Sequence, residues 1–222
     1  MNKKHIAFIP SRAGSAGFPN KNSIFFDLTA DFIDKIGWFD QVIVSSNDNK
    51  VIGKAQDREY EVIEREEKLS GPSISIKEVI KDASMKMEKN SNAMIWLFYI
   101  PILYKKVFHF NEVKKIIEEQ SVNSIISFLP AKTHPYHCWN INQSKITQYV
   151  KNNIYRRQDL PDAWYYHHYI CSFSLSVLDE LDNELMFEKT YPYLLDEKTR
   201  EKIVEIDTPN DLKKWEAVKN QE

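Results

Sequence analysis

Cysteine and glycine are scarce in this sequence, and the scarcity narrows the classes of protein that fit it. Only two cysteines, Cys138 and Cys171, occur among 222 residues, and their spacing does not match a metal-ligand motif. So few cysteines fit a reduced, cytoplasmic protein. Five glycines are present, and two of them, Gly14 and Gly17, lie in one loop near the N-terminus. That loop is the first candidate for a binding function.

Long apolar runs and an excess of either charge are also lacking. The longest apolar run, residues 93–103, is interrupted by Pro101 and is well short of the roughly 20 residues that span a membrane. The apolar stretch near the start stops at Pro10, which is too short for a signal peptide. With 30 basic and 32 acidic residues the net charge is -2, so nothing indicates a nucleic-acid partner. We expect one domain over residues 1–222, with neither a membrane nor a nucleic acid as partner.

The most informative segment that is present covers residues 6–22. Its apolar run ends at Pro10 and opens into a loop of small residues that carries Arg12 and Lys21. A short apolar run bounded by turn signals predicts a buried strand. A glycine-containing loop after a strand can bring backbone N–H groups close to phosphate oxygens, and the two cations supply the opposing charge. A strand with an ordinary surface loop fits the same segment, and neither common glycine-rich nucleotide motif is matched.

Strand-like and helix-like segments alternate along the chain. The strand-like runs after the first are residues 42–46, 61–64, 95–100 and 124–128. Apolar residues recur at helical spacing over 76–87, and Asn111 is the expected N-cap of a further helix. This alternation predicts an α/β fold, a mostly parallel sheet with helices on both faces.

Three later segments depart from that rhythm. Residues 134–155 are rich in Asn, Gln, Lys and aromatic residues, which predicts a small protruding arm or strand pair, or a dimerisation insertion. Serines alternate with apolar residues over 169–176, as in a half-exposed strand. Near the C-terminus, Thr208 as N-cap with Pro209 and Asp211 predicts a final helix.

Two acidic residues precede that helix. In a strand-like reading of residues 204–207, Glu205 and Asp207 share one face because side chains alternate along a strand. Two such carboxylates suit a hard divalent cation that also holds substrate phosphates. A solvated strand face is the alternative interpretation.

Basic and aromatic residues gather between positions 155 and 169. Arg156 and Arg157, followed by Gln158, could clamp a phosphate or a carboxylate, although an arginine pair is also common as plain surface charge. Residues 165–169 present aromatic faces and His167, which suit a sugar. A strand entry whose rings pack internally is the alternative. Adjacent histidines share no face of a strand or helix, so a His–His metal site is not expected.

Together these motifs resemble the CMP-sugar synthetases, the acylneuraminate cytidylyltransferase family. The family loop reads A-R-x-G-S-K-G-x-P-x-K-N, and Ala16 stands here in place of its lysine. The matching positions are Arg12, Gly14, Ser15, Gly17, Pro19, Lys21 and Asn22. The family's R-R-Q-D-L-P is matched by residues 156–161, and its D-I-D-T by Glu205 to Thr208 with Glu205 for the first acid.

The middle of the chain diverges from the family. Arg65 carries over from the R-P-x-E-L segment, in which the arginine contacts the nucleotide. The following D-T-A-S-S is absent. The family's L-Q-P-T-S-P-L-R aligns with residues 96–103, where only Pro101 is kept. Residues 165–169 replace an N-G-A-like turn that faces the sugar. The resemblance therefore implies a divergent member.

This resemblance implies a Rossmann-like nucleotidyltransferase fold and a defined reaction. The expected enzyme transfers CMP from CTP to an acidic 2-keto sugar of the nonulosonic-acid type and releases pyrophosphate, for surface polysaccharide or glycoconjugate synthesis. It would work in the cytoplasm, as a homodimer. A cytidylyltransferase for a different small acceptor and a non-catalytic nucleotide- or sugar-binding relative are the alternatives.

The resemblance also implies roles for individual residues. Arg12, Lys21 and Asp207 would be catalytic, with Mg²⁺ held by Asp207 and Glu205. The expected nucleotide-binding residues are Ser11, Arg12, Gly14, Ser15, Lys21, Asn22 and Arg65. The expected substrate-binding residues are Arg156, Arg157, Gln158 and His167.

Overall fold

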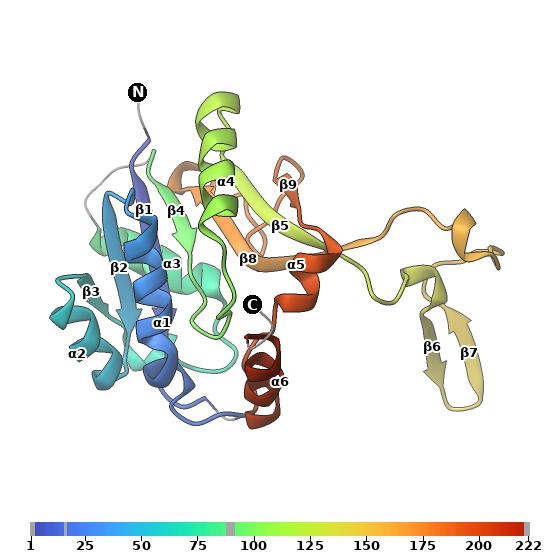
Figure 1. Cartoon of the computed structure of the whole chain (residues 1–222), viewed down its shortest axis with the longest axis horizontal. Coiled ribbons are helices and arrows are strands. Elements are labelled where there is room, and N and C mark those ends of the chain that lie inside the picture. The colour runs from blue at the N-terminus through green and yellow to red at the C-terminus, as the bar shows by residue number, and fades with distance from the viewer. Residues whose placement is uncertain (1–2, 16, 88–91, 220–222) are drawn as a thin grey trace.

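A seven-stranded sheet with the strand order β3-β2-β1-β4-β8-β5-β9 forms the centre of the computed structural model, which describes residues 3–15, 17–87 and 92–219 (Figure 1). Its strands are β1 (His5–Ser11), β2 (Gln41–Ser46), β3 (Glu61–Glu64), β4 (Met94–Leu97), β5 (Ser124–Pro130), β8 (Trp164–Ser174) and β9 (Tyr191–Leu194). Neighbouring strands are parallel except that β8 runs antiparallel to β4 and β5. The predicted mostly parallel sheet is confirmed.

Helices cover both faces of this sheet. They are α1 (Lys21–Ile36), α2 (Asn49–Asp57), α3 (Ile76–Lys86), α4 (Val107–Gln120), α5 (Glu197–Lys202) and α6 (Pro209–Lys219). Side chains alternate along β1, so that Ala7 and Ile9 pack with α1, α2 and α4 while Ile6 and Phe8 pack with α3 on the other face. None of the helices in the described residues is long and apolar enough to cross a membrane.

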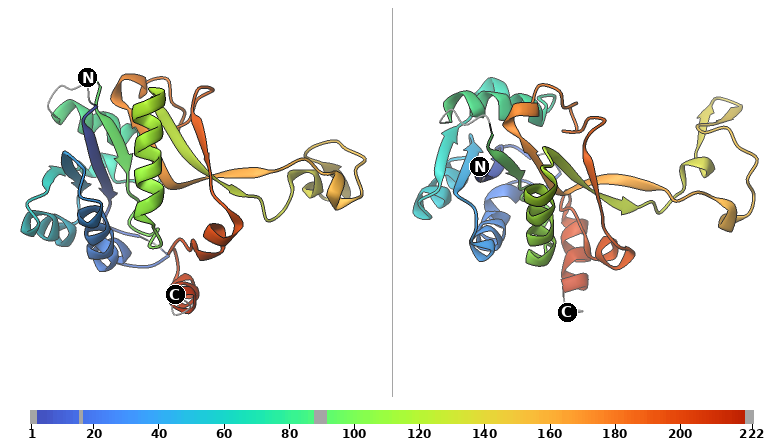
Figure 2. Two further views of the ribbon diagram at one scale, coloured as in Figure 1. Left: turned by 45° about the horizontal axis from the view of Figure 1, so that its top comes forward. Right: turned by 90° about the horizontal axis from the view of Figure 1, so that it is seen from above.

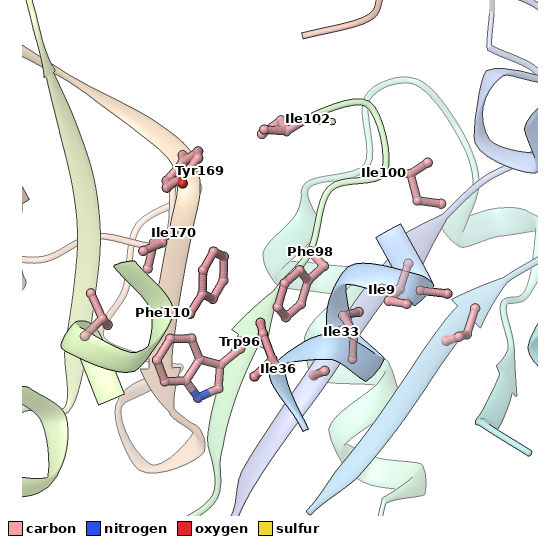
Figure 3. Packing of buried hydrophobic residues seen from close by; sticks show 14 of the residues in the cluster. Ile9, Ile33, Ile36, Trp96, Phe98, Ile100, Ile102, Phe110, Tyr169 and Ile170 are labelled. Atoms are coloured by element: carbon pink, nitrogen blue, oxygen red, sulfur yellow. The ribbon is translucent and has the colours of Figure 1, made fainter. Parts of the chain in front are cut away.

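Aromatic residues fill the core beneath α1 and α4. Trp96 at β4 and Phe98 just after it meet Phe110 of α4, and the rings of Phe98 and Phe110 stack with centroids 5.4 Å apart and planes at 11° (Figure 3). All three side chains are buried. This packing explains why the segment after β4 turns inward at Phe98.

Two helix starts were predicted, and one of them is wrong. At α6, the predicted cap forms, because Thr208 Oγ1 accepts from the Asp211 backbone N–H at 3.3 Å and Asp211 Oδ2 accepts from the Thr208 N–H at 3.0 Å. Helix α4 begins at Val107, ahead of the predicted N-cap Asn111. Asn111 instead accepts a 2.7 Å hydrogen bond from Trp38 Nε1. Burying Phe110 requires the helix to start a turn earlier.

Three predicted strands also differ from the structure. The prediction of a half-exposed strand over 169–176 is wrong, because β8 lies between β4 and β5 and buries Ser172 and Ser174 as well as the apolar residues. The predicted strand over 204–207 is an extended segment with a single bridge, between Glu205 and Ile102. β4 ends at Leu97, earlier than the predicted 95–100.

Residues 131–163, here called the arm, extend away from the sheet between β5 and β8 (Figure 2). The arm contains the predicted pair of strands, β6 (Trp139–Asn142) and β7 (Lys145–Gln148), which pair antiparallel. Ile141 and Ile146 lie opposite each other on these strands and are 72% and 65% exposed. The arm therefore presents an apolar surface that the sheet does not cover.

Candidate active site

A cavity of about 740 Å³ opens at the carboxyl ends of the parallel strands. Arg12 reaches it from the loop after β1, Arg65 from the segment after β3, and Tyr99 from the turn after β4. In open α/β sheets this edge is where ligands bind, because loops from neighbouring strands converge there. The cavity is therefore the candidate site.

Positive charge without a counter-ion gathers on one side of the cavity. Arg12 donates from Nη1 to the Ser70 carbonyl at 3.3 Å, and Arg65 donates from Nη2 to the Ser45 carbonyl at 2.9 Å. Neither guanidinium forms an ion pair with a carboxylate of the described residues. Burial and the nearby charge of Arg12 lower the pKa of Arg65 to about 10. Such an uncompensated pair favours a bound anion, to which arginine donates bidentately.

The loop after β1 is fixed from several directions. Asn22 donates from Nδ2 to the Arg12 carbonyl at 3.0 Å, and the Ala13 N–H donates to Asn47 Oδ1 at 2.9 Å. Gly14 has a φ of 77°, which glycine adopts without strain. The loop leads directly into α1, which begins at Lys21 and adds the positive end of its dipole to the cavity.

Gly17 brings this loop against the acidic segment at residues 205–207. A Cβ placed on Gly17 would lie only 2.5 Å from the backbone oxygen of Asp207. Such a distance is far below van der Waals contact, so no other residue fits this loop without movement. Gly17 therefore allows the loop after β1 to lie directly against the acidic segment at residues 205–207.

The acidic side of the cavity is formed by Glu205 and Asp207. The bridge to Ile102 fixes Glu205, and the Ile206 N–H donates to the Pro101 carbonyl at 3.0 Å. Lys21 Nζ lies 2.5 Å from Asp207 Oδ1, and the Lys21 side chain is 15% exposed while that of Asp207 is 61% exposed. The two predicted carboxylates thus share the cavity with the predicted lysine.

The carboxylates of Glu205 and Asp207 fit a magnesium ion whose remaining coordination positions are filled by substrate phosphates. Burial raises the pKa of Glu205, the charge of Asp207 raises it further, and Lys21 opposes the rise. A divalent cation would relieve this repulsion. No cluster of three or more His, Cys, Asp or Glu side chains in the described residues could hold a metal ion alone. Mg²⁺ commonly takes one or two carboxylates and completes its shell with water and substrate phosphates.

The remaining predicted nucleotide residues divide into two groups. Ser15, Asn22 and Arg65 line the cavity beside Arg12 and Lys21. Ser11 is buried at the end of β1, and neither it nor Gly14 lines the cavity. Ala16, where the family has a lysine, lies outside the described residues.

The predicted substrate-binding arginines lie on the arm, away from this cavity. Arg156 pairs through Nε with Asp159 Oδ2 at 2.6 Å, and Gln158 lies in the same short turn. Arg157 lines a second cavity of about 530 Å³ at the base of the arm, together with His134 and His137. Within one chain, the arm residues and the first cavity are separate, and their role in substrate binding stays a prediction.

His167 likewise does not line the first cavity. It lies at an irregularity in the pairing of β8 with β5, where Ser127 Oγ donates to the His167 carbonyl at 2.5 Å. Its Nδ1 is buried and has no hydrogen-bond partner in the described residues. Burial lowers the pKa of His167 to about 4, with the charges of His168 and Lys105 adding to the shift. The ring is therefore held neutral.

Several cavity residues were missed by sequence reasoning. Tyr99 and Thr208 lie inside motifs in which other residues were the candidates, and Gly71 and Pro72 lie where the family has D-T-A-S-S. Asn183 and Glu184 carried no sequence signal at all. The further lining residues are Pro10, Gly17, Leu69, Ile74, Ser75, Ile76, Val79 and Pro101.

No family model matches the chain. The chain is similar to the N-acylneuraminate cytidylyltransferases of Streptococcus agalactiae serotypes V, III and Ia. Each is 26% identical over 172 residues, which cover 73% of this chain and 41% of the relative. The chain thus spans about two-fifths of the length of these relatives. The resemblance inferred from the motifs is confirmed by this similarity.

Solved structures share the fold. CMP:2-keto-3-deoxy-manno-octonic acid synthetase complexed with CTP matches with a TM-score of 0.67 at 12% identity, covering 99% of both chains. A 4-diphosphocytidyl-2C-methyl-D-erythritol synthase matches with a TM-score of 0.65 at 12% identity, covering 98% of this chain and 99% of that chain. The 2-C-methyl-D-erythritol 4-phosphate cytidylyltransferase of Francisella tularensis matches with a TM-score of 0.65 at 11% identity, covering 97% and 100%. The predicted Rossmann-like nucleotidyltransferase fold is confirmed.

Proposed function

We propose that this protein is a CTP-dependent cytidylyltransferase that transfers CMP to an acidic 2-keto sugar of the nonulosonic-acid type. The observation that carries the proposal is a single cavity with three kinds of charged group. It is lined by two arginines that have no carboxylate partner in the described residues, by two carboxylates, and by Lys21, which contacts Asp207. The similarity to N-acylneuraminate cytidylyltransferases supports the choice of nucleotide and acceptor. The product would supply surface polysaccharide or glycoconjugate synthesis.

The reaction balances with the groups that the cavity provides. The acceptor hydroxyl oxygen forms a bond to the α-phosphorus of CTP, and the bond from that phosphorus to the bridging oxygen of the β-phosphate breaks. Pyrophosphate leaves with the electron pair of the broken bond, and the proton of the attacking hydroxyl is released to solvent. Arg12 and Lys21 would hold the triphosphate, and charge neutralisation with correct orientation accounts for most of the rate gain in such reactions.

Magnesium would be held by Asp207 and Glu205. When bound, the ion neutralises phosphate charge. Lys21 already contacts Asp207, so its ammonium would bridge the metal-binding carboxylate and the phosphates of a bound CTP. Arg65, buried against Ser45, would bind the nucleotide from the β3 side. Asn22 would keep the loop after β1 in the shape that the phosphates need.

A homodimer is part of the proposal, and the arm supports it. A two-stranded hairpin is at best marginally stable in water, and exposed apolar side chains such as Ile141 and Ile146 mark an interaction surface. A partner chain that covers the arm would bring Arg156 to Gln158 near a cavity other than their own. There the arginines could bind the carboxylate of the acceptor.

We assign the enzyme to the cytoplasm. Its two cysteines are free, which fits a reducing compartment.

Release of pyrophosphate tests this function. The purified chain is incubated with CTP, Mg²⁺ and a panel of acidic 2-keto sugars, with sugar phosphates that lack a carboxylate as a second panel. We expect pyrophosphate and a CMP-sugar in equal amounts with an acidic keto sugar. Asp207→Asn should remove this activity, whereas the matched control Asp31→Asn, which neutralises an exposed α1 carboxylate paired with Arg58, should not. Turnover with the sugar phosphates alone would show that the acceptor is a sugar phosphate and not an acidic 2-keto sugar.

A further inference from the structure

The cavity has two walls with different chemistry. On the β3 side stand Arg65 and the segment from Leu69 to Ile76, and on the β4 side stand Tyr99, Asn183 and Glu184. The inference that follows rests on the proposed function. If Arg65 binds the nucleotide, the β4 side is left for the acceptor.

A rigid turn carries Asn183 and Glu184 to this wall. After β8 the chain crosses the α3 face of the sheet, where the Lys77 ammonium donates to the Asp179 carbonyl at 3.0 Å. Asp182 Oδ1 then accepts from the backbone N–H groups of Glu184 and Met186, each at 2.9 Å. The turn is thus tied both to α3 and to its own aspartate.

Two further features fix the backbone around Glu184, the buried and strained Leu185 that follows it and a contact with His168. Leu185 is buried in the core and has a φ of 63°, a conformation that costs free energy in a non-glycine residue and persists only where the surroundings impose it. His168 Nε2 lies 3.2 Å from the Glu184 carbonyl oxygen. Glu184 therefore lines the cavity from a fixed backbone, and burial together with the neighbouring Glu184 carboxylate raises the pKa of Tyr166.

The acceptor wall is acidic. Burial chiefly raises the pKa of Tyr99, with smaller contributions from the neighbouring Glu184 and Glu205. Tyr99 thus keeps its proton between two carboxylates. Of the lysine and arginines that line the cavity, Arg65 lies near enough to Tyr99 to interact with it, and no lysine or arginine of the described residues forms an ion pair with Glu184. A carboxylate would be repelled from the Glu184 end of the wall, and an N–H or O–H donor would be attracted there.

We propose that Glu184, assisted by Asn183, is a specificity-determining residue that accepts a hydrogen bond from a positively charged nitrogen substituent on the acceptor sugar. The group recognised would be an amino or amidino nitrogen, away from the hydroxyl that attacks CTP. The acceptor would then carry both charges, with its carboxylate bound elsewhere and its nitrogen bound at Glu184.

Direct binding measurements test this inference without turnover. Calorimetry compares a 2-keto sugar acid that carries a free amine with its N-acetylated form, on protein saturated with a non-hydrolysable CTP analogue. We expect the wild type to bind the amine about 10- to 100-fold more tightly, since hydrogen bonds to charged groups have about that strength. Glu184→Gln should lose most of the preference, and Glu184→Lys should reverse it. Glu188→Gln, an exposed carboxylate on the same loop that does not line the cavity, is the matched control.

The outcomes separate this inference from the proposed function. Equal binding of the two sugars, or an unchanged preference in Glu184→Gln, overturns the role of Glu184. A change in affinity for the CTP analogue rather than for the sugar overturns it as well, because Glu184 would then contact the nucleotide. A preserved preference without pyrophosphate release from CTP overturns the transferase function and leaves the binding role of Glu184 standing.

Discussion

Replacing Gly17 by alanine should uncouple the two halves of the candidate site. The φ of Gly17 is outside the left-handed region, so alanine can adopt its backbone conformation, and the only obstacle is contact. The new Cβ would lie 2.5 Å from the Asp207 backbone oxygen, so the gap must widen by about 1 Å to reach ordinary contact. The position of the Cβ is fixed by the backbone of residue 17, and the atom it meets is a backbone oxygen, so no side-chain rotation can relieve the clash.

The magnitude follows from that displacement. A 1 Å misplacement of catalytic groups costs on the order of 100-fold in rate. Overpacking of this kind destabilises a protein by about 1–3 kcal/mol, which a domain of normal stability survives. We therefore expect Gly17→Ala to remain folded and to release pyrophosphate about 100-fold more slowly at saturating CTP.

Two other glycines serve as controls in the same assay. A Cβ on Gly53, inside α2, meets nothing within 4 Å, so Gly53→Ala should keep full activity and gain up to about 1 kcal/mol of stability. A Cβ on Gly71 would lie 3.6 Å from the Ile74 side chain in the same cavity, and Gly71→Ala should change the rate little. Wild-type turnover in folded Gly17→Ala would refute the reasoning, since the loop would then not lie against Asp207 in the working enzyme.

The remaining predictions concern the charged groups of the site and one buried histidine. Asp207→Asn should reduce pyrophosphate release far more than Glu205→Gln at saturating Mg²⁺, because Asp207 contacts Lys21; equal losses in the two variants would contradict this order. Lys21→Met should weaken CTP binding, measured by calorimetry, by about 10- to 100-fold through loss of a charged hydrogen bond. Lys54→Met removes a comparable ion pair, with Asp27 at 2.6 Å, and should leave CTP binding unchanged. His167 has a folded-state pKa of about 4, below its unfolded value, so only the unfolded chain takes up its proton between pH 6.5 and 4. The free energy of unfolding should therefore fall over that range by up to about 3 kcal/mol, and His167→Phe should flatten the fall in denaturant titrations at several pH values.

Most strands that the sequence predicted correctly have continuous apolar runs, whereas β3 was predicted at Glu61–Glu64 from only two apolar residues. β1, β2 and β5 are nearly fully buried, so their sequences contain the run itself. β8 was misread because serine is small enough to be buried: Ser172 and Ser174 share one buried face of this central strand, and Cys171 and Phe173 share the other. Ser174 satisfies its hydroxyl with Ser176 Oγ at 2.8 Å, a contact that alternation of residue types cannot reveal. Polar alternation therefore indicated exposure where there is none.

The same limit applies to the site. Arg12 and Lys21 belong to one contiguous loop, and Glu205 and Asp207 to one short segment, so local patterns identified both. Their meeting, between residues 186 positions apart, came only from the family resemblance. Glu184 reaches the cavity because the chain folds back across α3 after β8. No local pattern encodes that path, which is why the residue carried no signal.

The eroded central motif has a structural explanation that bears on function. Where the family has L-Q-P-T-S-P-L-R, this chain buries Leu97 and Ile100 in its core, so two positions that are polar in the family no longer face a ligand. Tyr99 lies between them, keeps a hydroxyl and lines the cavity. At this strand end, Tyr99 and the turn that carries Glu184 therefore supply the polar groups that the family draws from its own motif. Because Arg12, Lys21 and Asp207 still meet in one cavity, we infer that the divergence changes which acceptor is bound while the groups that act on the nucleotide are kept.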